Sequence, residues 1–312
     1  MSKAIIVGSK GQDGVLLTSL LRGKNYGLLG LDLDYFDETR FEWISKVDIL
    51  DSAMVAGLIK NTKPDELYYL AAYHHSSQDT AIDGAKLVEK SFDVHVKGYT
   101  NFLEAIKQES VHTKVLYASS SLIFGDPSKE MVCEDTPVDP KNPYAITKYS
   151  GMQLGKMYRD TQGMFISNVI LFNHESVLRE EKFVTMKIIK TALEIKRGLE
   201  TELVLGDLDA EVDWGYAPDY VEAMWRVLQL GVPGDFVVST GNKHTVRDFV
   251  RIVFDYLKLD WQKHVKENNQ VLTRRRNPVV GDNTKLRKLT GWTPSVTFEK
   301  MIENIIEEKM KI

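Results

Sequence analysis

Short apolar segments alternate with longer amphipathic segments along the first half of the chain. The amphipathic segments carry apolar residues at helical spacing, as in the helix predicted from about Gly14 to Leu21. Such alternation is typical of a parallel sheet that helices cover on both faces. We therefore expect an α/β fold with a doubly wound parallel sheet. Its predicted strands are Ala4 to Val7, Leu28 to Leu31, Glu66 to Ala72, Lys114 to Ala118 and Ile166 to Phe172.

The order of elements changes after Phe172. Neither a repeat nor a Gly-, Ser- or Pro-rich linker interrupts the chain, so we expect two closely packed domains with a ligand cleft between them. The first is predicted over residues 1–172, with 214–239 returning to it, and a smaller C-terminal substrate-binding domain over 173–213 and 240–312. The predicted elements here are helices Phe183 to Arg197 (closed by Gly198), Asp219 to Leu230, Thr284 to Leu289 and Thr297 to Lys311, and strands Leu203 to Leu205 and Asp235 to Ser239.

A glycine-rich turn joins the first strand to the first helix. Three glycines at this spacing let the backbone turn sharply and approach a pyrophosphate at the positive end of the helix. A plain strand-to-helix turn would use the same residues, but the context of strand, turn and helix favours a dinucleotide. We predict a Rossmann-type domain whose cofactor contacts here are Gly8, Gly11, Gln12, Asp13 and Gly14.

Asp32 ends the second strand, where its carboxylate can accept hydrogen bonds from the adenosine ribose hydroxyls and would repel a 2′-phosphate. The first domain is therefore expected to bind NAD rather than NADP. Asp48 and Ile49 are placed beside the adenine, although a simple strand end explains them equally well. The predicted cofactor set is completed by Leu70, Ala71 and Ala72.

Composition narrows the class of protein. Of the 312 residues 43% are hydrophobic and 27% charged, and the net charge of -4 argues against a broad nucleic-acid or membrane-surface binder. The single cysteine, Cys133, excludes an internal disulfide and suits a reducing compartment. No apolar run approaches the ~18 residues of a spanning helix, and the N-terminus leads directly into a strand. We expect a cytoplasmic protein, and the histidine spacing predicts no metal site.

Tyr144 and Lys148 lie one helical turn apart on the same face of a predicted helix. A nearby ammonium stabilises a phenolate, as does the positive charge of an oxidised nicotinamide, and together they lower the tyrosine pKa so that it can act as a base on an alcohol. This spacing alone is common on solvated helices. The hydroxyls of Ser119, Ser120 and Ser121 follow a strand at the carboxyl edge of the sheet, where such folds bind ligands. We predict that Ser120, Tyr144 and Lys148 are catalytic.

With these motifs in place, the chain resembles the extended short-chain dehydrogenase/reductases that act on nucleotide sugars, and most closely the GDP-mannose 4,6-dehydratases. The resemblance implies that Ser120 orients the sugar 4-hydroxyl, that Tyr144 is the base and that Lys148 is its partner. It also implies a GDP-sugar substrate. The stretches that carry it include Asn142 to Ala145, Leu171 to Ser176, Phe183 to Thr185, Leu205 to Ala210, Asp213 to Gly215, Asp219 to Trp225 and Gly291 to Pro294.

The resemblance further implies a set of substrate-binding residues and a quaternary structure. Guanidinium groups grip phosphates bidentately, so the arginine run is a candidate diphosphate contact, with a solvated basic loop as the alternative. Members of this family commonly associate through helices such as those predicted within Thr80 to Gln108 and from Pro143 to Asp160, so we expect a homodimer or homotetramer. The predicted substrate contacts are Ser121, Leu122, Asn173, Val184, Thr185, Lys187, Arg274, Arg275 and Arg276.

One departure from the family pattern bears on the reaction. Leu122 stands where the dehydratases carry the glutamate that removes the C5 proton, and leucine can neither accept nor donate a proton. We therefore expect NAD-dependent oxidation of C4 of GDP-manno-heptose or GDP-mannose to a 4-keto sugar, without dehydration. The reduced cofactor would then be released, or reoxidised by a second substrate such as a 2-oxo acid. His74 and His75 could replace the missing base, but structural histidines are commoner and are the favoured interpretation.

Three alternatives remain open at this point. The chain could be a 4,6-dehydratase with a non-standard base, or a nucleotide-sugar 4-epimerase, since its serine triplet resembles that of epimerases. A catalytically silent NAD-sensing scaffold is the alternative outside enzymes, and the intact Ser120, Tyr144 and Lys148 argue against it.

Overall fold

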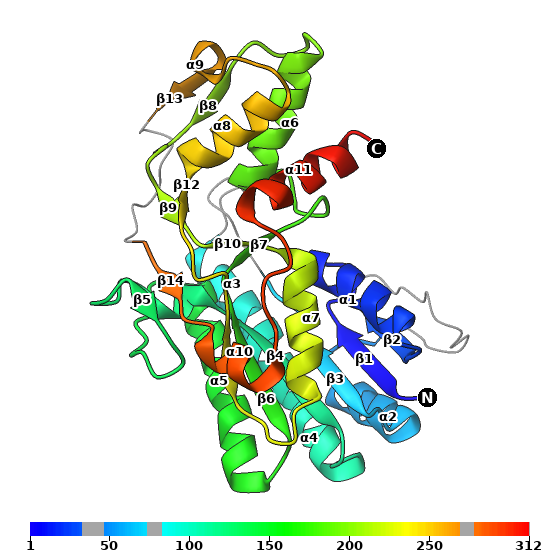
Figure 1. Cartoon of the computed structure of the whole chain (residues 1–312). Coiled ribbons are helices and arrows are strands. Elements are labelled where there is room, and N and C mark those ends of the chain that lie inside the picture. The colour runs from blue at the N-terminus through cyan, green and yellow to red at the C-terminus, as the bar shows by residue number, and fades with distance from the viewer. Residues whose placement is uncertain (33–46, 74–82, 269–277, 312) are drawn as a thin grey trace.

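A six-stranded sheet forms the centre of the computed structural model, which describes residues 1–32, 47–73, 83–268 and 278–311 (Figure 1). All its pairings are parallel, and the strand order is β2, β1, β3, β4, β6, β11. The predicted doubly wound parallel sheet is thus confirmed. The strands are β1 (Lys3–Val7), β2 (Gly27–Leu31), β3 (Glu66–Tyr69), β4 (Lys114–Ser120), β6 (Ile166–Leu171) and β11 (Asp235–Val238).

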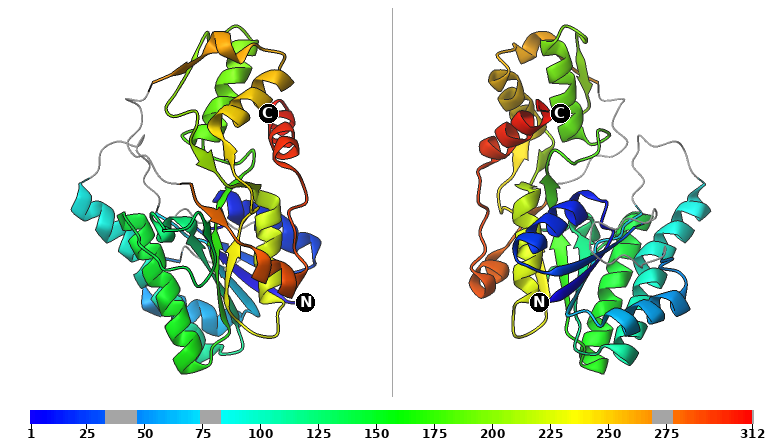
Figure 2. Two further views of the ribbon diagram at one scale, coloured as in Figure 1. Left: turned by 60° about the vertical axis from the view of Figure 1, so that its left-hand side comes forward. Right: turned by 90° about the vertical axis from the view of Figure 1, so that its right-hand side faces the viewer.

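Helices cover both faces of this sheet, which explains why the central strands are apolar on both sides. All six residues of β6 are buried, as are four of the five in β1. Figure 2 shows α1, α7 and α10 on one face, and α2, α4 and α5 on the other. These helices are α1 (Gln12–Gly23), α7 (Ala217–Leu228), α10 (Thr284–Thr290), α2 (Ser52–Thr62), α4 (Tyr99–Glu109) and α5 (Pro143–Gln162).

The strand order reverses between β1 and β3. From β1 the chain continues to β2 on one side, whereas β3 lies on the other side of β1. In open α/β sheets the carboxyl ends of the strands diverge at this point and leave a crevice for a ligand. The predicted strand from Glu66 to Ala72 ends earlier, at Tyr69, so Leu70 to Ala72 lie in this crevice region as irregular chain.

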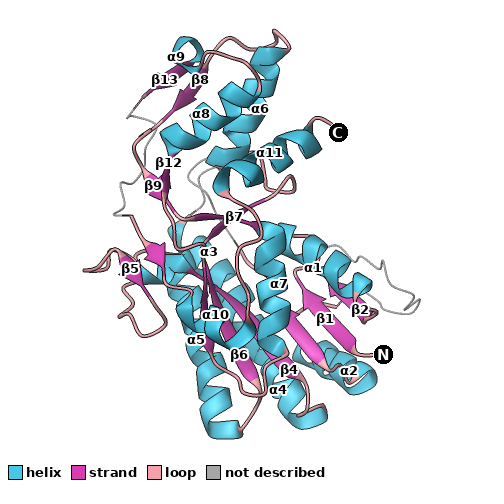
Figure 3. Ribbon diagram, in the orientation of Figure 1, coloured by secondary structure: helices cyan, strands magenta, loops and turns pink. Residues whose placement is uncertain are grey.

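A second hydrophobic cluster lies apart from the cluster around the sheet. In Figure 3 this part of the molecule is mainly helical, with short paired strands. Leu286 and Trp292, which the predicted boundaries assign to the second domain, pack in the first cluster. The domain boundaries stay a prediction. The second cluster is built on α6 (Val184–Lys196), β8 (Leu203–Leu205), α8 (Val246–Tyr256) and α11 (Phe298–Lys309), beside α9 (Trp261–His264) and β13 (Val265–Glu267).

Short strand pairs connect the two parts. Strands β7 and β10 are parallel, as are β14 and β5, whereas β12 and β9 are antiparallel. The local sequence pattern did not predict any of these strands, which have two or three residues each. They are β7 (Asn173–Glu175), β10 (Trp214–Tyr216), β5 (Met131–Val132), β14 (Val280–Gly281), β9 (Glu211–Val212) and β12 (His244–Thr245).

Two helical runs were predicted to mediate association. The first is α3 (Gly84–Phe92), a π-helical turn η1 (Asp93–Gly98) and α4, and the second is α5. Met152 and Tyr158 of α5 are buried inside the chain, whereas Ile146 and Met157 are exposed on one face of the same helix. The homo-oligomer stays a prediction. In the described part of the chain, no helix is both long and apolar enough to cross a membrane.

Candidate active site

The turn after β1 is held by two glycines that no other residue could replace. Gly8 has φ +90°, and a Cβ there would lie 2.7 Å from the Ala71 backbone nitrogen. A Cβ on Gly14 would lie 2.3 Å from the Gly8 carbonyl oxygen. These contacts pack the turn against both the first helix and the chain that leaves β3. Gly11 is different, because its nearest neighbour would be at an ordinary contact distance of 3.5 Å.

The residues of this turn fit a dinucleotide. Helix α1 begins at Gln12 without a side-chain cap, which suits a phosphate as the acceptor for its first backbone N–H groups. The Ser9 hydroxyl is buried and has no hydrogen-bond partner among the described residues, which suits a phosphate oxygen as acceptor. The Lys10 backbone nitrogen donates to Asp32 Oδ2 at 2.9 Å and so connects the turn to the end of β2.

The other predicted cofactor residues occupy two places. Leu70 donates its backbone N–H to Val7 at 2.8 Å, so the segment from Leu70 to Ala72 lies beside the glycine turn. Asp48 and Ile49 precede α2, and the Asp48 carbonyl accepts from the Asp51 N–H at 3.1 Å, so they belong to a turn, and their place beside the adenine stays a prediction. The Asp48 carboxylate accepts from the Leu50 N–H, and the Ile49 side chain packs on the first hydrophobic cluster.

A buried ion pair joins the glycine turn to β7. His174 Nε2 lies 2.9 Å and 3.0 Å from the two carboxylate oxygens of Asp13, while its Nδ1 donates to the Phe172 carbonyl at 2.7 Å. Both ring nitrogens face acceptors, so the protonated imidazolium satisfies both. Burial lowers the pKa of His174, but the Asp13 charge and hydrogen bond outweigh it and leave the pKa raised. Burial likewise raises the pKa of Asp13, and His174 reverses this to a lowered value.

Lys148 lies in the interior of the site. Its ammonium donates to the Ala118 carbonyl at 2.9 Å and to the Ala71 carbonyl at 3.3 Å, and the side chain is only 2% exposed. Burial disfavours the charged form and lowers the pKa of Lys148 to about 7, against an opposing effect of Asp13. The lysine therefore connects the ends of β3 and β4 and is poised to exchange a proton near neutral pH.

Tyr144 is half-buried in the first turn of α5, beside Lys148. The Lys148 Nζ lies 5.9 Å from the centre of the tyrosine ring. We expect this ammonium and the positive charge of an oxidised nicotinamide together to lower the tyrosine pKa. In the chain alone, burial raises the pKa of Tyr144 to about 12, with Arg179 acting in the lowering direction and Asp13 in the raising direction. Desolvation outweighs the charges of the chain, so the phenol is held protonated until a ligand changes its surroundings.

The serine triplet ends β4 as predicted. Ser120 Oγ accepts from the Leu122 N–H at 3.3 Å and caps a short 3₁₀ helix, η2 (Ser121–Phe124). Ser121 and Leu122 are both half-exposed at the carboxyl edge of the sheet. Leu122 thus presents an apolar side chain at the end of the strand that carries Ser120.

The predicted substrate residues on β7 and α6 differ in what they can contact. Asn173 is exposed at the start of β7, and Val184 is exposed at the start of α6. Thr185 is buried and donates to Glu175 at 2.6 Å, while Lys187 donates to the Val204 carbonyl at 2.9 Å. Their substrate contacts stay predictions. Arg274, Arg275, Arg276, His74 and His75 lie outside the described residues.

Sequence reasoning missed three polar residues of this region. Arg179 lies 3.5 Å from Glu175 and stacks on Phe183, whose ring centre is 3.6 Å from the guanidinium carbon. His174 pairs with Asp13, 161 positions earlier, and His95 contacts the Tyr144 ring edge-on at 5.2 Å. No local spacing could reveal these pairs, because only the folded sheet brings their elements together.

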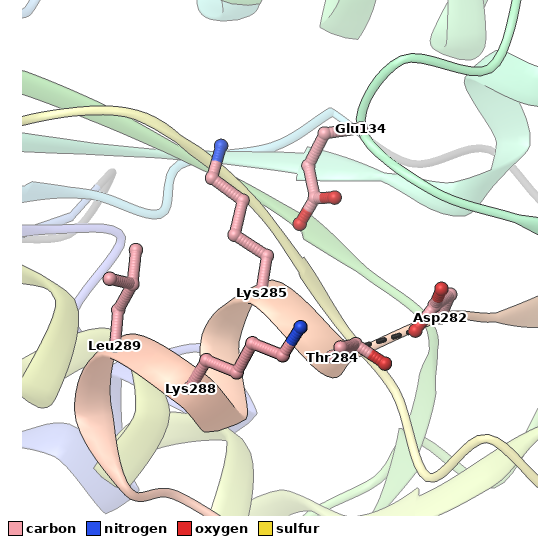
Figure 4. Close-up of a pocket in the computed structure, with 6 residues that line it drawn as sticks. All are labelled: Glu134, Asp282, Thr284, Lys285, Lys288 and Leu289. Carbon is pink, nitrogen blue, oxygen red and sulfur yellow. Dashed lines mark hydrogen bonds between the residues drawn. The ribbon is translucent and has the colours of Figure 1, made fainter.

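A surface pocket beside α10 contains none of the predicted site residues (Figure 4). Its polar groups hold the local fold: Lys285 donates to the Asp235 carbonyl at 2.8 Å and Glu134 accepts from the Val237 N–H at 2.8 Å. We therefore assign it no part in the chemistry. Within the described ranges, no group of three or more His, Cys, Asp or Glu side chains is placed to hold a metal ion. The pocket is lined by Glu134, Asp282, Thr284, Lys285, Lys288 and Leu289.

Comparison with known proteins agrees with this geometry. The family model described as GDP-mannose 4,6 dehydratase matches residues 5–305. GDP-mannose 4,6 dehydratase 2 of Arabidopsis thaliana is 36% identical over 330 aligned positions, which cover 99% of this chain and 87% of that protein.

Two solved structures share the fold. RMD from Pseudomonas aeruginosa, complexed with NADPH, has a TM-score of 0.84 at 21% identity and covers 100% of both chains. A dTDP-glucose 4,6-dehydratase from Bacillus anthracis, in complex with NAD, has a TM-score of 0.85 at 19% identity and covers 100% of this chain and 97% of that one. The matched range, residues 5–305, covers both parts of the molecule and the residues of the site described above. The chain belongs to the GDP-mannose 4,6-dehydratase family.

Proposed function

We propose that this enzyme oxidises C4 of a GDP-sugar, GDP-manno-heptose or GDP-mannose, to a 4-keto sugar with NAD and does not dehydrate the product. The observation that carries the proposal is Leu122, which follows β4 in the short helix η2, at the position where the resemblance to the dehydratases implies a glutamate. A missing general base costs about 10²-fold to 10⁴-fold in rate. Elimination across C5 and C6 would lack its catalyst, whereas oxidation at C4 does not need that base.

The groups for oxidation come from this chain. Ser120 would orient the 4-hydroxyl, and Tyr144 would take its proton. Lys148 would hold the ends of β3 and β4 in place and return the proton toward solvent at its lowered pKa of about 7. NAD, when bound, supplies the hydride acceptor. The glycine turn, the unpartnered Ser9 hydroxyl and Asp32 support this cofactor, since Asp32 would repel a 2′-phosphate.

Nearby polar residues do not readily replace the missing base. Glu175 is 2% exposed, and its carboxylate accepts from Thr185 at 2.6 Å and faces Arg179. Burial raises the pKa of Glu175, but its carboxylate is already engaged by Thr185, which argues against Glu175 as a substitute base. His95 is fully buried and both its ring nitrogens are engaged.

Oxidation at C4 requires a destination for the two electrons. A 2-oxo acid as second substrate would accept the hydride and a proton and leave as the 2-hydroxy acid. This restores the oxidised cofactor and balances the cycle. Stoichiometric release of the reduced cofactor is the alternative, and the two differ in whether turnover continues when a 2-oxo acid replaces added NAD.

Mass spectrometry of the product tests the proposal directly. The purified enzyme is incubated with GDP-mannose or GDP-manno-heptose, with and without 2-oxoglutarate. The expected product is lighter than the substrate by two hydrogens. A product lighter by one water would instead establish dehydration, and an unchanged mass with altered stereochemistry would establish epimerisation.

A further inference from the structure

His95 lies in a π-helical turn that the sheet holds open. The turn η1 interrupts the helical run between α3 and α4, and such turns leave carbonyls without their usual helical donors. Tyrosine hydroxyls from the sheet satisfy two of them: Tyr69 donates to the Val94 carbonyl at 2.5 Å and Tyr117 to the His95 carbonyl at 3.1 Å. The turn is therefore fixed to β3 and β4, and it directs the His95 ring into the interior.

The ring of His95 is 0% exposed and bridges two segments. Its Nε2 accepts from the Tyr73 backbone N–H at 2.9 Å, so in the neutral ring the proton is on Nδ1. Nδ1 then donates to Thr147 Oγ1 at 2.7 Å, and Thr147 donates onward to the Pro143 carbonyl at 2.8 Å. The hydrogen bonds all run in one direction, from the chain after β3 to the first turn of α5.

These two segments carry different parts of the site. Tyr73 ends the stretch whose Ala71 backbone adjoins Gly8 of the glycine turn. Thr147 lies between Tyr144 and Lys148, and the Tyr144 ring meets the His95 ring edge-on at 5.2 Å and 89°. Close packing leaves little freedom, since a Cβ on Gly151 of α5 would lie 2.7 Å from the His95 carbonyl oxygen.

We propose that His95 is a positioning residue that locks the chain after β3 to the first turn of α5, so that the cofactor-binding segment and the Tyr144 ring are aligned by one side chain. Its two hydrogen bonds have separable roles. The Nε2 bond holds the cofactor-binding segment, and the Nδ1 bond holds the tyrosine. Only the second role rests on the proposed oxidation at C4, because the first concerns NAD binding alone.

Conservative substitutions separate the two bonds. His95→Gln keeps an acceptor near the Nε2 position for Tyr73, whereas His95→Asn keeps a donor near Nδ1 for Thr147. His95→Phe keeps a flat ring and loses both bonds. The matched pair Thr147→Ser and Thr147→Val retains or removes the hydroxyl from the other side. Thermal unfolding of each variant identifies any general loss of folding.

The NAD dissociation constant, measured by calorimetry, tests the first role. Loss of one buried hydrogen bond is expected to weaken NAD binding about tenfold in His95→Asn, while His95→Gln stays within about threefold of the parent. Equal affinities in the parent, His95→Gln and His95→Asn would overturn this role, as would losses that only follow the unfolding temperature. The result does not depend on any sugar being turned over.

The turnover number for C4 oxidation tests the second role. His95→Gln and Thr147→Val are each expected to lower kcat about tenfold. Thr147→Ser retains the hydroxyl and is expected to keep kcat near that of the parent. Because both substitutions remove the same bond, the double variant should be no slower than either single variant. Multiplying losses in the double variant would overturn the role. Absence of turnover in the parent itself would instead contradict the proposed function and leave the NAD result to decide on His95.

Discussion

Buried ionisable groups differ between the two ends of the site: they are held charged at the cofactor end, around Asp13, and shifted toward their neutral forms at the catalytic end, around Tyr144. Asp13 and His174 form an ion pair, and each moves the pKa of the other toward its charged form. Tyr144 and Lys148 are desolvated, and the opposing charges of Arg179 and Asp13 are too weak to offset this. Their pKa values move toward the neutral forms, to about 12 and about 7. A fixed charge distribution suits binding. Groups that gain and lose a proton easily suit catalysis.

The largest effect is expected from removing the phenol. Tyr144→Phe keeps the ring beside His95 but removes the hydroxyl oxygen that we propose accepts the alcohol proton. We expect kcat for C4 oxidation to fall by about 10³-fold while NAD affinity stays near that of the parent. A rate assay with a parallel NAD titration measures both. Residual activity above a tenth of the parent rate would contradict the role of Tyr144.

Breaking the ion pair should affect stability, with a defined pH window. Because folding raises the pKa of His174, its pairing stabilises the fold fully at pH values below the unfolded pKa. That stabilisation is lost as pH rises through the folded pKa. Because folding lowers the pKa of Asp13, its pairing stabilises the fold fully at pH values above the unfolded pKa. That stabilisation is lost as pH falls through the folded pKa. Asp13→Asn should therefore lower the free energy of unfolding by about 3 kcal/mol between these limits and by less on either side.

Denaturant unfolding of the parent and Asp13→Asn across this pH range measures that difference. The comparison fails if the gap between the two proteins is the same at every pH. Asp13 also faces the glycine turn, so NAD binding by the variant is measured separately and does not enter the stability argument.

Substitution of Lys148 is expected to change the free energy of unfolding in the opposite direction. Because burial lowers its pKa to about 7, the cost of holding it charged is fully present below that pH and is relieved as pH rises toward its unfolded value of 10.5. Lys148→Met should lose catalysis yet gain on the order of 2 kcal/mol in unfolding free energy at pH 6, after allowance for its two lost hydrogen bonds. The gain should shrink by pH 9. A variant less stable than the parent at pH 6 would show that the ammonium is well compensated.

Asp32 gives the smallest expected change and concerns the choice of cofactor. Asp32→Asn removes the charge that would repel a 2′-phosphate and weakens the acceptor for the ribose hydroxyls. NAD affinity should fall about fivefold and NADP affinity should rise. Calorimetric titration with both dinucleotides checks this. If the parent already binds NADP as tightly as NAD, the assignment of NAD is wrong.

The sheet and the glycine turn could be predicted because their signals are local. Runs such as Ile166 to Leu171 read as buried strands, and three glycines before a helix indicate a nucleotide turn. The contacts of His95 and His174 could not be predicted, since they join elements far apart in sequence. The desolvation of Tyr144 could not be predicted for a related reason: the Lys148 spacing is visible in the sequence, whereas desolvation depends on the packed surroundings.

The proposed oxidation without dehydration depends most on Leu122, and placing a carboxylate at this position tests it most directly. Leu122→Glu supplies a carboxylate at the end of β4, and Leu122→Gln supplies the same length without a base. We predict that the parent and Leu122→Gln form only the product that is two hydrogens lighter, whereas Leu122→Glu also forms the product lighter by one water. A parent enzyme that already releases the dehydrated 4-keto-6-deoxy sugar, with no external oxidant, would contradict the account.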